Sequence, residues 1–293
     1  MQVAVIGVGV MGSAIAGRLL DMQAHVSVFD VEPAKCDALR AKGARVAASP
    51  RDATAVAQYA ITSLNTADIV EAAVFGTNGV AAAAAPDKLL IDMSSIDAGR
   101  TASMAARLAA ETGMGWVDAP LSGGAPAAVR GAMTLMVGGN EADFERARPL
   151  LSLLSNNFTR LGGSGAGQTV KLINQILCAS YFIAVAEAVH FAEAHGVDAT
   201  AIPAALAGGR ADSRILQEFM AKMARRDFSP TGRIDNMLKD LETVQAAALA
   251  KHIALPVTSL ITELHRMLVA GGRGAADSAE YVRLCDFGAG EKR

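Results

Sequence analysis

One lysine is unusual because of the residues around it. Lys171 is the only charged residue in the run GAGQTVKLINQILCASYF (165–182), which is otherwise largely apolar. Lysine is rarely buried unless it is paired or used chemically, and a lysine that gives up its proton can serve as a general base. The alternative is a solvated helix face, where most lysines lie. The neighbouring residues decide between these interpretations.

Polar residues near Lys171 recur at spacings of three and four, which places them on one face of a helix. They are Gln168, Lys171, Asn174, Gln175 and Cys178. A stripe that faces bulk water usually contains several charges, whereas this one contains a single lysine with amides beside it. The pattern favours a lined site on a helix that is entered through a flexible glycine-rich segment, GGSGAG (162–167).

A second group of residues could bind a dinucleotide. A G-x-G-x-x-G pattern lies between an apolar β-branched run and a helical pattern. There the first glycine allows a tight turn, the second lets the backbone approach a pyrophosphate, and the third lets the helix pack on the strand. N–H groups at the helix start would then face the phosphates. The predicted cofactor turn consists of Gly7, Val8, Gly9, Val10, Met11 and Gly12.

Asp30 ends the second expected strand, at the position where an acidic residue binds ribose. Its carboxylate would accept hydrogen bonds from both ribose hydroxyls and repel a 2′-phosphate. The next residues are Val31 and Glu32, so no arginine follows that could bind such a phosphate. The sequence therefore predicts NAD(H) rather than NADP(H). The simpler alternative for Asp30 is a solvated strand end.

Strand and helix patterns alternate through the first half of the chain. This alternation predicts a mainly parallel sheet with helices on both faces, an α/β, Rossmann-type doubly wound domain. The expected strands are 2–7, 25–30, 44–49, 59–64, 88–95, 115–124, 132–139 and 158–162. The expected helices are 11–22, 33–43, 50–57, 66–75, 98–112 and 141–154.

Past Gly167 the strand pattern stops. One helical segment runs from about 165 to 195, and its length of roughly 45 Å would tie two domains or two subunits together. Further helices are expected at 198–207, 213–225, 232–252, 257–270 and 278–286. We predict an NAD-binding domain at 1–163 and an all-helical domain for substrate binding and dimerisation at 164–293.

Composition restricts the class of protein. The 293 residues are 52% hydrophobic and 19% charged, and the net charge of −2 offers no basic field for nucleic acid or an anionic membrane. We expect neither a long apolar membrane span nor a signal peptide. Three scattered cysteines and five dispersed histidines indicate no disulfide framework and no metal site. These features predict a cytoplasmic protein without a bound metal.

Four separated segments resemble the β-hydroxyacid dehydrogenases, a family that includes 3-hydroxyisobutyrate dehydrogenase, tartronate semialdehyde reductase and, more distantly, 6-phosphogluconate dehydrogenase. They are GVGVMGSAIAGRLL (7–20), DAPLSGG (118–124), GSGAGQTVKLINQ (163–175) and MLKDLETVQAA (237–247). IDMSSID (91–97) and MTLMVGG (133–139) also look like family segments. Because these segments cover nearly the whole chain, the combination is far more specific than any one of them.

The resemblance implies that Lys171 is the catalytic acid/base. It would take the substrate's hydroxyl proton as hydride leaves for the nicotinamide, and return it to the alkoxide in reduction. Because free lysine is protonated at neutral pH, burial or a neighbouring cation, such as Lys239, must favour its neutral form. Asn174 would bind the substrate and hold the lysine in line, and Asp240 is interpreted as a structural partner.

The resemblance also implies a substrate loop at Ser122, Gly123 and Gly124, where a hydroxyl and exposed N–H groups suit a carboxylate. An ordinary strand-to-helix turn would explain these residues too. SLNT (63–66) replaces the proline-containing loop that the family has after the fourth strand. Additional cofactor contacts are expected from Ser63, Leu64, Asn65, Ser95 and Lys239, the last also next to the substrate.

Three points stay open. Arg210, Asp212 and Arg214 would lie towards the substrate pocket, which favours a polar or larger acid, but they could equally form dimer salt bridges. A non-catalytic NAD-binding interaction protein and an imine reductase-like enzyme are the functional alternatives, and both usually lack the lysine. A homodimer or homotetramer is expected, whereas substrate, direction and stereochemistry cannot be derived from the sequence.

Overall fold

The structure is a computed structural model that describes residues 1–285. The chain divides into two compact units, Met1–Lys171 and Leu172–Arg293, each with hydrophobic core residues of its own. The domain boundary expected at 163/164 stays a prediction. The final residue of the helix expected at 278–286 lies outside the described residues.

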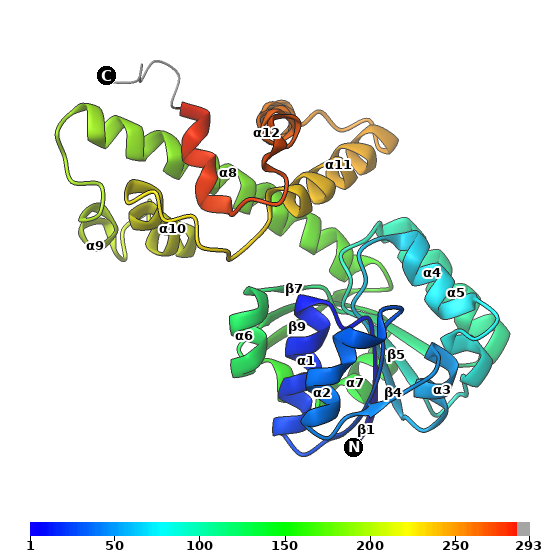
Figure 1. Cartoon of the computed structure of the whole chain (residues 1–293). Helices are drawn as coiled ribbons and strands as arrows, with labels where there is room; N and C mark the ends of the chain where they lie inside the picture. Colours follow the sequence, from blue (N-terminus) through cyan, green and yellow to red (C-terminus); the bar gives the residue numbers. More distant parts are fainter. Residues whose placement is uncertain (286–293) are drawn as a thin grey trace. The chain divides into compact units, whose positions relative to one another are not determined.

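The N-terminal unit contains a nine-stranded, mainly parallel sheet (Figure 1). The strand order is β3-β2-β1-β4-β5-β6-β8-β7, with β9 beside β8, and β8 runs antiparallel to β6 and β7. The predicted doubly wound sheet is therefore confirmed. The strands are β1 (Gln2–Ile6), β2 (His25–Phe29), β3 (Arg45–Val46), β4 (Tyr59–Thr62), β5 (Leu89–Asp92), β6 (Gly115–Asp118), β7 (Leu121–Ser122), β8 (Thr134–Gly138) and β9 (Asn157–Gly162).

Helices cover both faces of this sheet (Figure 1). Because successive strand residues point to opposite faces, Val3 and Val5 enter one core while Ala4 and Ile6 enter the other. The first core is covered by α1 (Val10–Asp21), α2 (Asp37–Ala41), α6 (Gly124–Arg130) and α7 (Glu141–Leu154). The second is covered by α3 (Pro50–Ala55), α4 (Ala67–Phe75), α5 (Ala98–Thr112) and the 3-10 turn η2 (Val80–Ala83), while the 3-10 turn η1 (Pro33–Cys36) precedes α2.

The long helix expected after residue 165 is α8 (Ala166–Ala194), with 29 residues. By length and composition it is the one helix among residues 1–285 that could cross a membrane, so the expectation of no such segment stays a prediction. The same criterion is met by core helices of soluble proteins, and 39% of its most apolar stretch is buried within the fold.

The named elements in the described part of the C-terminal unit are all helices joined by loops. Phe182 of α8 packs its ring 4.8 Å from Phe219 and 5.3 Å from Tyr281, measured between centroids, and this aromatic group lies in the core. The elements after α8 are α9 (Ile202–Leu206), α10 (Arg214–Ala224), α11 (Ile234–Ala250), α12 (Pro256–Leu268), the π-helical turn η3 (Val269–Arg273) and the 3-10 helix η4 (Ser278–Cys285). The expected all-helical region is thus observed.

Candidate active site

The residues predicted to bind cofactor follow the carboxyl ends of neighbouring parallel strands. Gly7 follows β1, Asp30 follows β2 and Ser63 follows β4. The strand order reverses between β1 and β4, and doubly wound sheets bind ligands outside the carboxyl ends at such a reversal. The N-terminal unit therefore brings these three predicted residues to one edge of its sheet.

The glycine turn combines two close contacts with one open position. A Cβ on Gly12 would lie 1.8 Å from the carbonyl oxygen of Gly7, whereas a Cβ on Gly9 would meet no atom within 4 Å. Gly7 has a φ of +87°, and its own Cβ would lie 2.5 Å from the oxygen of Ser63. Gly9 carries no side-chain cap for α1 in the described chain, so the N–H end of this helix can receive a pyrophosphate.

The side chain of Asp30 is fixed directly behind this turn. Its Oδ2 accepts a hydrogen bond from the N–H of Val8 at 2.9 Å, and its Oδ1 accepts one from the N–H of Glu32 at 2.9 Å. The Val8 N–H therefore points to Asp30. Val10, the first residue of α1, is 79% exposed. Carboxylate oxygens can accept more than one hydrogen bond, so this geometry is compatible with ribose hydroxyls as further donors.

The loops after β4 and β5 are joined by a hydrogen bond. The N–H of Leu64 donates to the Oγ of Ser94 at 3.0 Å, next to the predicted cofactor residue Ser95. Asn65 follows Leu64 and is exposed. Three predicted cofactor residues thus lie on two connected loops at the same sheet edge as Gly7.

Lys171 lies beside the predicted substrate loop. Its Nζ donates to the carbonyl oxygen of Leu121 at 2.9 Å, and Ser122 is the next residue. Gly123 and Gly124 follow with φ angles of +116° and +65°, a conformation that favours glycine. Lys171 is only 9% exposed, so the solvated-face interpretation is excluded.

The polar stripe of α8 faces inward and its apolar neighbours face outward. Gln168 is fully buried and Gln175 is 8% exposed, whereas Ile173 and Leu177 are about half exposed. This is the reverse of an ordinary surface helix, whose apolar stripe faces the core. At Gln168 and Gln175 the stripe is therefore not a solvent-facing surface, and the prediction that it lines a site stays a prediction.

Within the C-terminal unit, the other predicted residues form one hydrogen-bonded chain. Asn174 Nδ2 donates to Gln175 Oε1 at 2.9 Å, and Gln175 Nε2 donates to Asp240 Oδ2 at 2.6 Å. Lys239 Nζ lies 3.0 Å from Asp240 Oδ1. Asp240 is therefore a pairing residue between α8 and α11, as the sequence interpretation had it.

The charged segment before α10 is largely engaged with itself. Asp212 accepts hydrogen bonds from the N–H of Gly208 and from Gln217, and Arg214 pairs with Glu218. Arg210 is exposed. Nothing in these contacts assigns the segment to a substrate.

Two buried carboxyl groups were not assigned a role from the sequence. Asp92 and Asp118 are register partners at the ends of β5 and β6, and both are fully buried. Burial raises the pKa of Asp92 to about 6, and it also raises the pKa of Asp118. Their signal was in the sequence, because LLID and GWVD each end an apolar run with an acidic residue.

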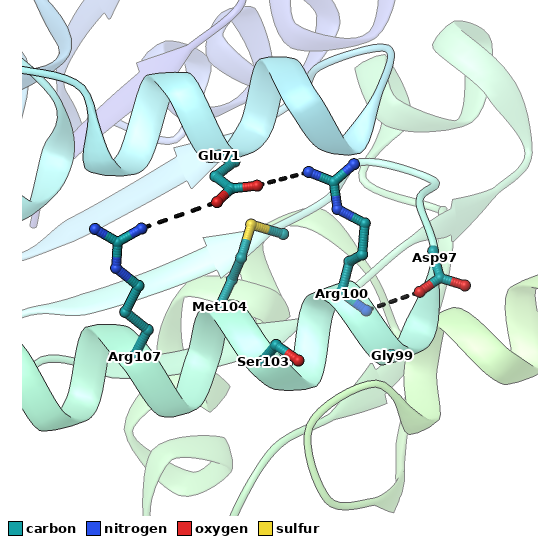
Figure 2. Close-up of a pocket in the computed structure, with 7 residues that line it drawn as sticks. All are labelled: Glu71, Asp97, Gly99, Arg100, Ser103, Met104 and Arg107. Atoms are coloured by element: carbon teal, nitrogen blue, oxygen red, sulfur yellow. Dashed lines mark hydrogen bonds and ion pairs between the residues drawn. The ribbon is translucent and has the colours of Figure 1, made fainter.

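A separate hollow of about 390 Å³ lies on the surface between α4 and α5 (Figure 2). Glu71 bridges Arg100 at 2.6 Å and Arg107 at 3.8 Å across it. Its remaining lining residues are Asp97, Gly99, Ser103 and Met104. Since the charged groups are paired with one another and no predicted site residue lines the hollow, it is not the candidate site. Within residues 1–285, His, Cys, Asp and Glu also form no group of three suited to a metal.

Comparisons with known proteins agree with this geometry. The family described as "NAD binding domain of 6-phosphogluconate dehydrogenase" matches residues 2–163, and "NAD-binding of NADP-dependent 3-hydroxyisobutyrate dehydrogenase" matches residues 165–285. The fold, the glycine turn and these matches define an NAD(P)-binding oxidoreductase.

Individual relatives match along their whole length. The chain is 36% identical to the 2-hydroxy-3-oxopropionate reductase of Escherichia coli, over 100% of this chain and 99% of that protein. It is 34% identical to the NAD-dependent L-serine dehydrogenase of Pseudomonas aeruginosa, with 97% and 98% covered. The structure of Mycobacterium tuberculosis 3-hydroxyisobutyrate dehydrogenase with L-serine superposes with a TM-score of 0.87 at 29% identity, covering 97% and 98%. The chain belongs to the β-hydroxyacid dehydrogenase family, which confirms the resemblance.

Proposed function

We propose that this protein is an NAD-dependent dehydrogenase that interconverts a small β-hydroxyacid and its 3-oxo acid or semialdehyde, with Lys171 as general acid/base. The observation that carries the proposal is the position of Lys171. Its ammonium is nearly buried at the carboxyl edge of the sheet and donates to the residue before Ser122. A buried lysine beside an anion-binding loop is suited to proton transfer at a substrate hydroxyl.

The cofactor turn supports NAD as the hydride carrier. Gly9 and the open start of α1 would hold the pyrophosphate, and Asp30 would hold the adenosine ribose. When bound, NAD accepts a hydride from the substrate carbon in oxidation and returns it in reduction. The Asp30 carboxylate disfavours a 2′-phosphate through charge repulsion, which is the support for NAD over NADP.

Residues of the chain itself would transfer the hydroxyl proton of the substrate and bind its carboxylate. Lys171 Nζ would take the proton of the substrate hydroxyl in oxidation and donate it to the alkoxide in reduction. Ser122 and the N–H groups of Gly123 and Gly124 would bind the substrate carboxylate. Asn174 follows Lys171 by one turn of α8, and its Nδ2 already donates to Gln175. Its Oδ1 would then accept from the substrate or from the lysine.

Two relatives suggest where to begin with substrates. Their names indicate acids with three carbons, 2-hydroxy-3-oxopropionate and L-serine. We therefore propose the pair of glycerate and 2-hydroxy-3-oxopropionate as the first candidate, within the hydroxyacid class.

The test follows NADH formation with glycerate, L-serine, threonate, tartrate, 3-hydroxypropionate and 3-hydroxyisobutyrate, each with NAD and with NADP. Lys171→Ala should lower kcat about 1,000-fold, in line with the loss of a general base. Lys88→Ala is the matched control, because the Lys88 ammonium also donates to a backbone carbonyl, that of Thr54, but lies at the end of α3. Wild-type turnover by Lys171→Ala would contradict the proposed role, and higher kcat/KM with NADP would contradict the cofactor.

We also propose a homodimer or homotetramer. Ile173, Leu177 and Tyr181 recur every four residues along α8 and are 45–50% exposed, and Val257 and Leu260 of α12 are more than 60% exposed. Exposed apolar patches of this kind mark interaction surfaces. Light scattering should give a multiple of 30.1 kDa, and Leu177→Glu should shift the mass towards one chain. A monomeric wild type would contradict this proposal.

A further inference from the structure

The first turn of α8 is held by a carboxylate from the neighbouring sheet. Asp118 Oδ1 accepts the N–H of Gly165 at 2.8 Å, and Asp118 Oδ2 accepts the N–H of Gln168 at 3.1 Å. Asp118 is fully buried at the end of β6. A carboxylate at the N-terminal end of a helix satisfies free N–H groups and complements the helix dipole. The start of α8 is therefore fastened to β6.

Glycines around Asp118 leave room for this contact. A Cβ on Gly167 would lie 2.3 Å from the carbonyl oxygen of Met136 and 2.8 Å from Asp118 Oδ2. A Cβ on Gly138 would lie 2.6 Å from both carboxylate oxygens. The interpretation of GGSGAG as a flexible entrance is therefore wrong at its second half, because the backbone at Gly167 packs directly against β8 and Asp118.

Gln168 joins the same helical turn to the loops predicted to bind cofactor. Its Oε1 accepts the N–H of Ile96 at 3.1 Å, and its Nε2 donates to the carbonyl oxygen of Ser94 at 2.9 Å. The Oγ of Ser94 in turn accepts the N–H of Leu64. Gln168 is fully buried, so both side-chain bonds form in a medium where an unmade bond is costly.

We propose that Asp118 and Gln168 are positioning residues, which set the place of Lys171 relative to the loops that carry Ser63–Asn65 and Ser95. Lys171 lies one turn after Gln168, and its Nζ binds Leu121, which follows Asp118 by three residues. The pair thus fixes the helical turn that precedes Lys171, and Asp118 joins this turn to the end of β6, three residues before Leu121. This inference rests on the proposed role of Lys171 as the acid/base.

The decisive variant is Gln168→Met, which keeps the side-chain volume and removes both side-chain hydrogen bonds. With the acid from the panel that is turned over fastest, kcat should fall about 100-fold, since a misplacement of about 1 Å has that effect. The dissociation constant of NADH should rise less than kcat falls, because Gly9 and Asp30, predicted to hold the pyrophosphate and ribose, have no hydrogen bond to Gln168 in the described chain. Deuterium at the reacting carbon should slow the variant more than the wild type. Asp118→Asn should act in the same direction.

A matched control separates positioning from general stability. Asp143 is also a buried carboxylate at a helix start, that of α7, and a Cβ on Gly115 would lie 2.3 Å from its Oδ1. Asp143→Asn should therefore lower stability but leave kcat and the isotope effect at wild-type values. If Gln168→Met is too unstable, Asp118→Asn is the second variant, because its single amide oxygen replaces two carboxylate acceptors for the N–H groups of Gly165 and Gln168.

Hydrogen exchange gives a readout that needs no substrate. Amides of 165–172 should exchange faster in Gln168→Met than in the wild type, and Asp143→Asn should leave them unchanged. If Gln168→Met matches Asp143→Asn in kcat, isotope effect and exchange while Lys171→Ala is inactive, the positioning role fails and the proposed function stands. If Lys171→Ala is fully active or no acid is turned over, the proposed function fails. Hydrogen exchange alone then decides whether Gln168 holds the start of α8 in place.

Discussion

Two helices begin in the N-terminal unit at glycine-rich segments, and they use their positive ends in opposite ways. At α1 no side chain caps Gly9 in the described residues, and space is open beside it. At α8 the carboxylate of Asp118 already accepts two N–H groups of the first turn. One helix end can thus receive an external anion, whereas the other is closed by an anion of the protein itself.

The glycines differ in the same sense. Gly12 packs against Gly7, a neighbour within the same turn, so the contact shapes a local loop. Gly167 packs against Met136 and Asp118, which come from two strands of the sheet. Glycine therefore shapes a cradle for the predicted cofactor in the first case and a tertiary joint in the second. The difference indicates that a glycine-rich helix start can receive a ligand only where its N–H groups stay unused.

The largest effect is expected at the cradle. Gly12→Ala would place a methyl 1.8 Å from the Gly7 oxygen and force α1 away from the turn. We expect NADH to bind at least about 100-fold more weakly, because the phosphate contacts depend on this geometry. Fluorescence titration of NADH measures the change, with circular dichroism to select a temperature at which the variant is folded.

Gly9→Ala is the matched control for this comparison. The same methyl meets no protein atom there, so the melting temperature should stay at the wild-type value. NADH binding should still weaken about tenfold, because the methyl fills the space left for the pyrophosphate. Unchanged NADH affinity in both variants would show that this turn is not the cofactor cradle.

The second effect concerns the joint at α8. Gly167→Ala should lower the free energy of unfolding by about 3 kcal/mol, because neither the Met136 carbonyl nor the buried Asp118 can move away freely. Gly163→Ala lies in the same segment and meets no atom within 4 Å, so it should change stability little. Urea denaturation compares the two. Equal stabilities would mean that the whole segment is a mobile linker.

Most elements of the fold could be predicted because the periodic spacing of their hydrophobic residues can be read within each segment of the sequence. The helix expected at 98–112 is α5 to the residue, and that expected at 141–154 is α7. The misses are short. No helix was expected over the seven residues of α6, which begin at Gly124 and contain Pro126. A helix that short depends on packing against α1 more than on its own residue preferences.

The candidate site divides in the same way. The turn at Gly7–Gly12 is a contiguous motif, so the spacing of its glycines is enough to predict the conformation of the turn. The joint at Asp118 depends on residues from separate strands and helices. Which of these residues form hydrogen bonds with one another is set by the register of the sheet. Helical spacing correctly grouped Gln168 with Lys171, but it could not reveal that the Gln168 amide binds Ser94 and Ile96.

The smallest effect is a dependence of stability on pH that arises at Asp92, the buried register partner of Asp118 in the neighbouring strand. Burial raises the pKa of Asp92 to about 6, whereas an aspartate in an unfolded chain has a pKa near ~3.9. Since the folded state holds this proton more tightly, Asp92 makes the free energy of unfolding fall as the pH rises from about 4 to about 6. Asp92→Asn removes this contribution, so the wild type should lose about 2 kcal/mol relative to the variant over that window. Urea denaturation at several pH values measures the difference. A difference that stays level between these pH values would show that Asp92 ionises within the sheet without cost.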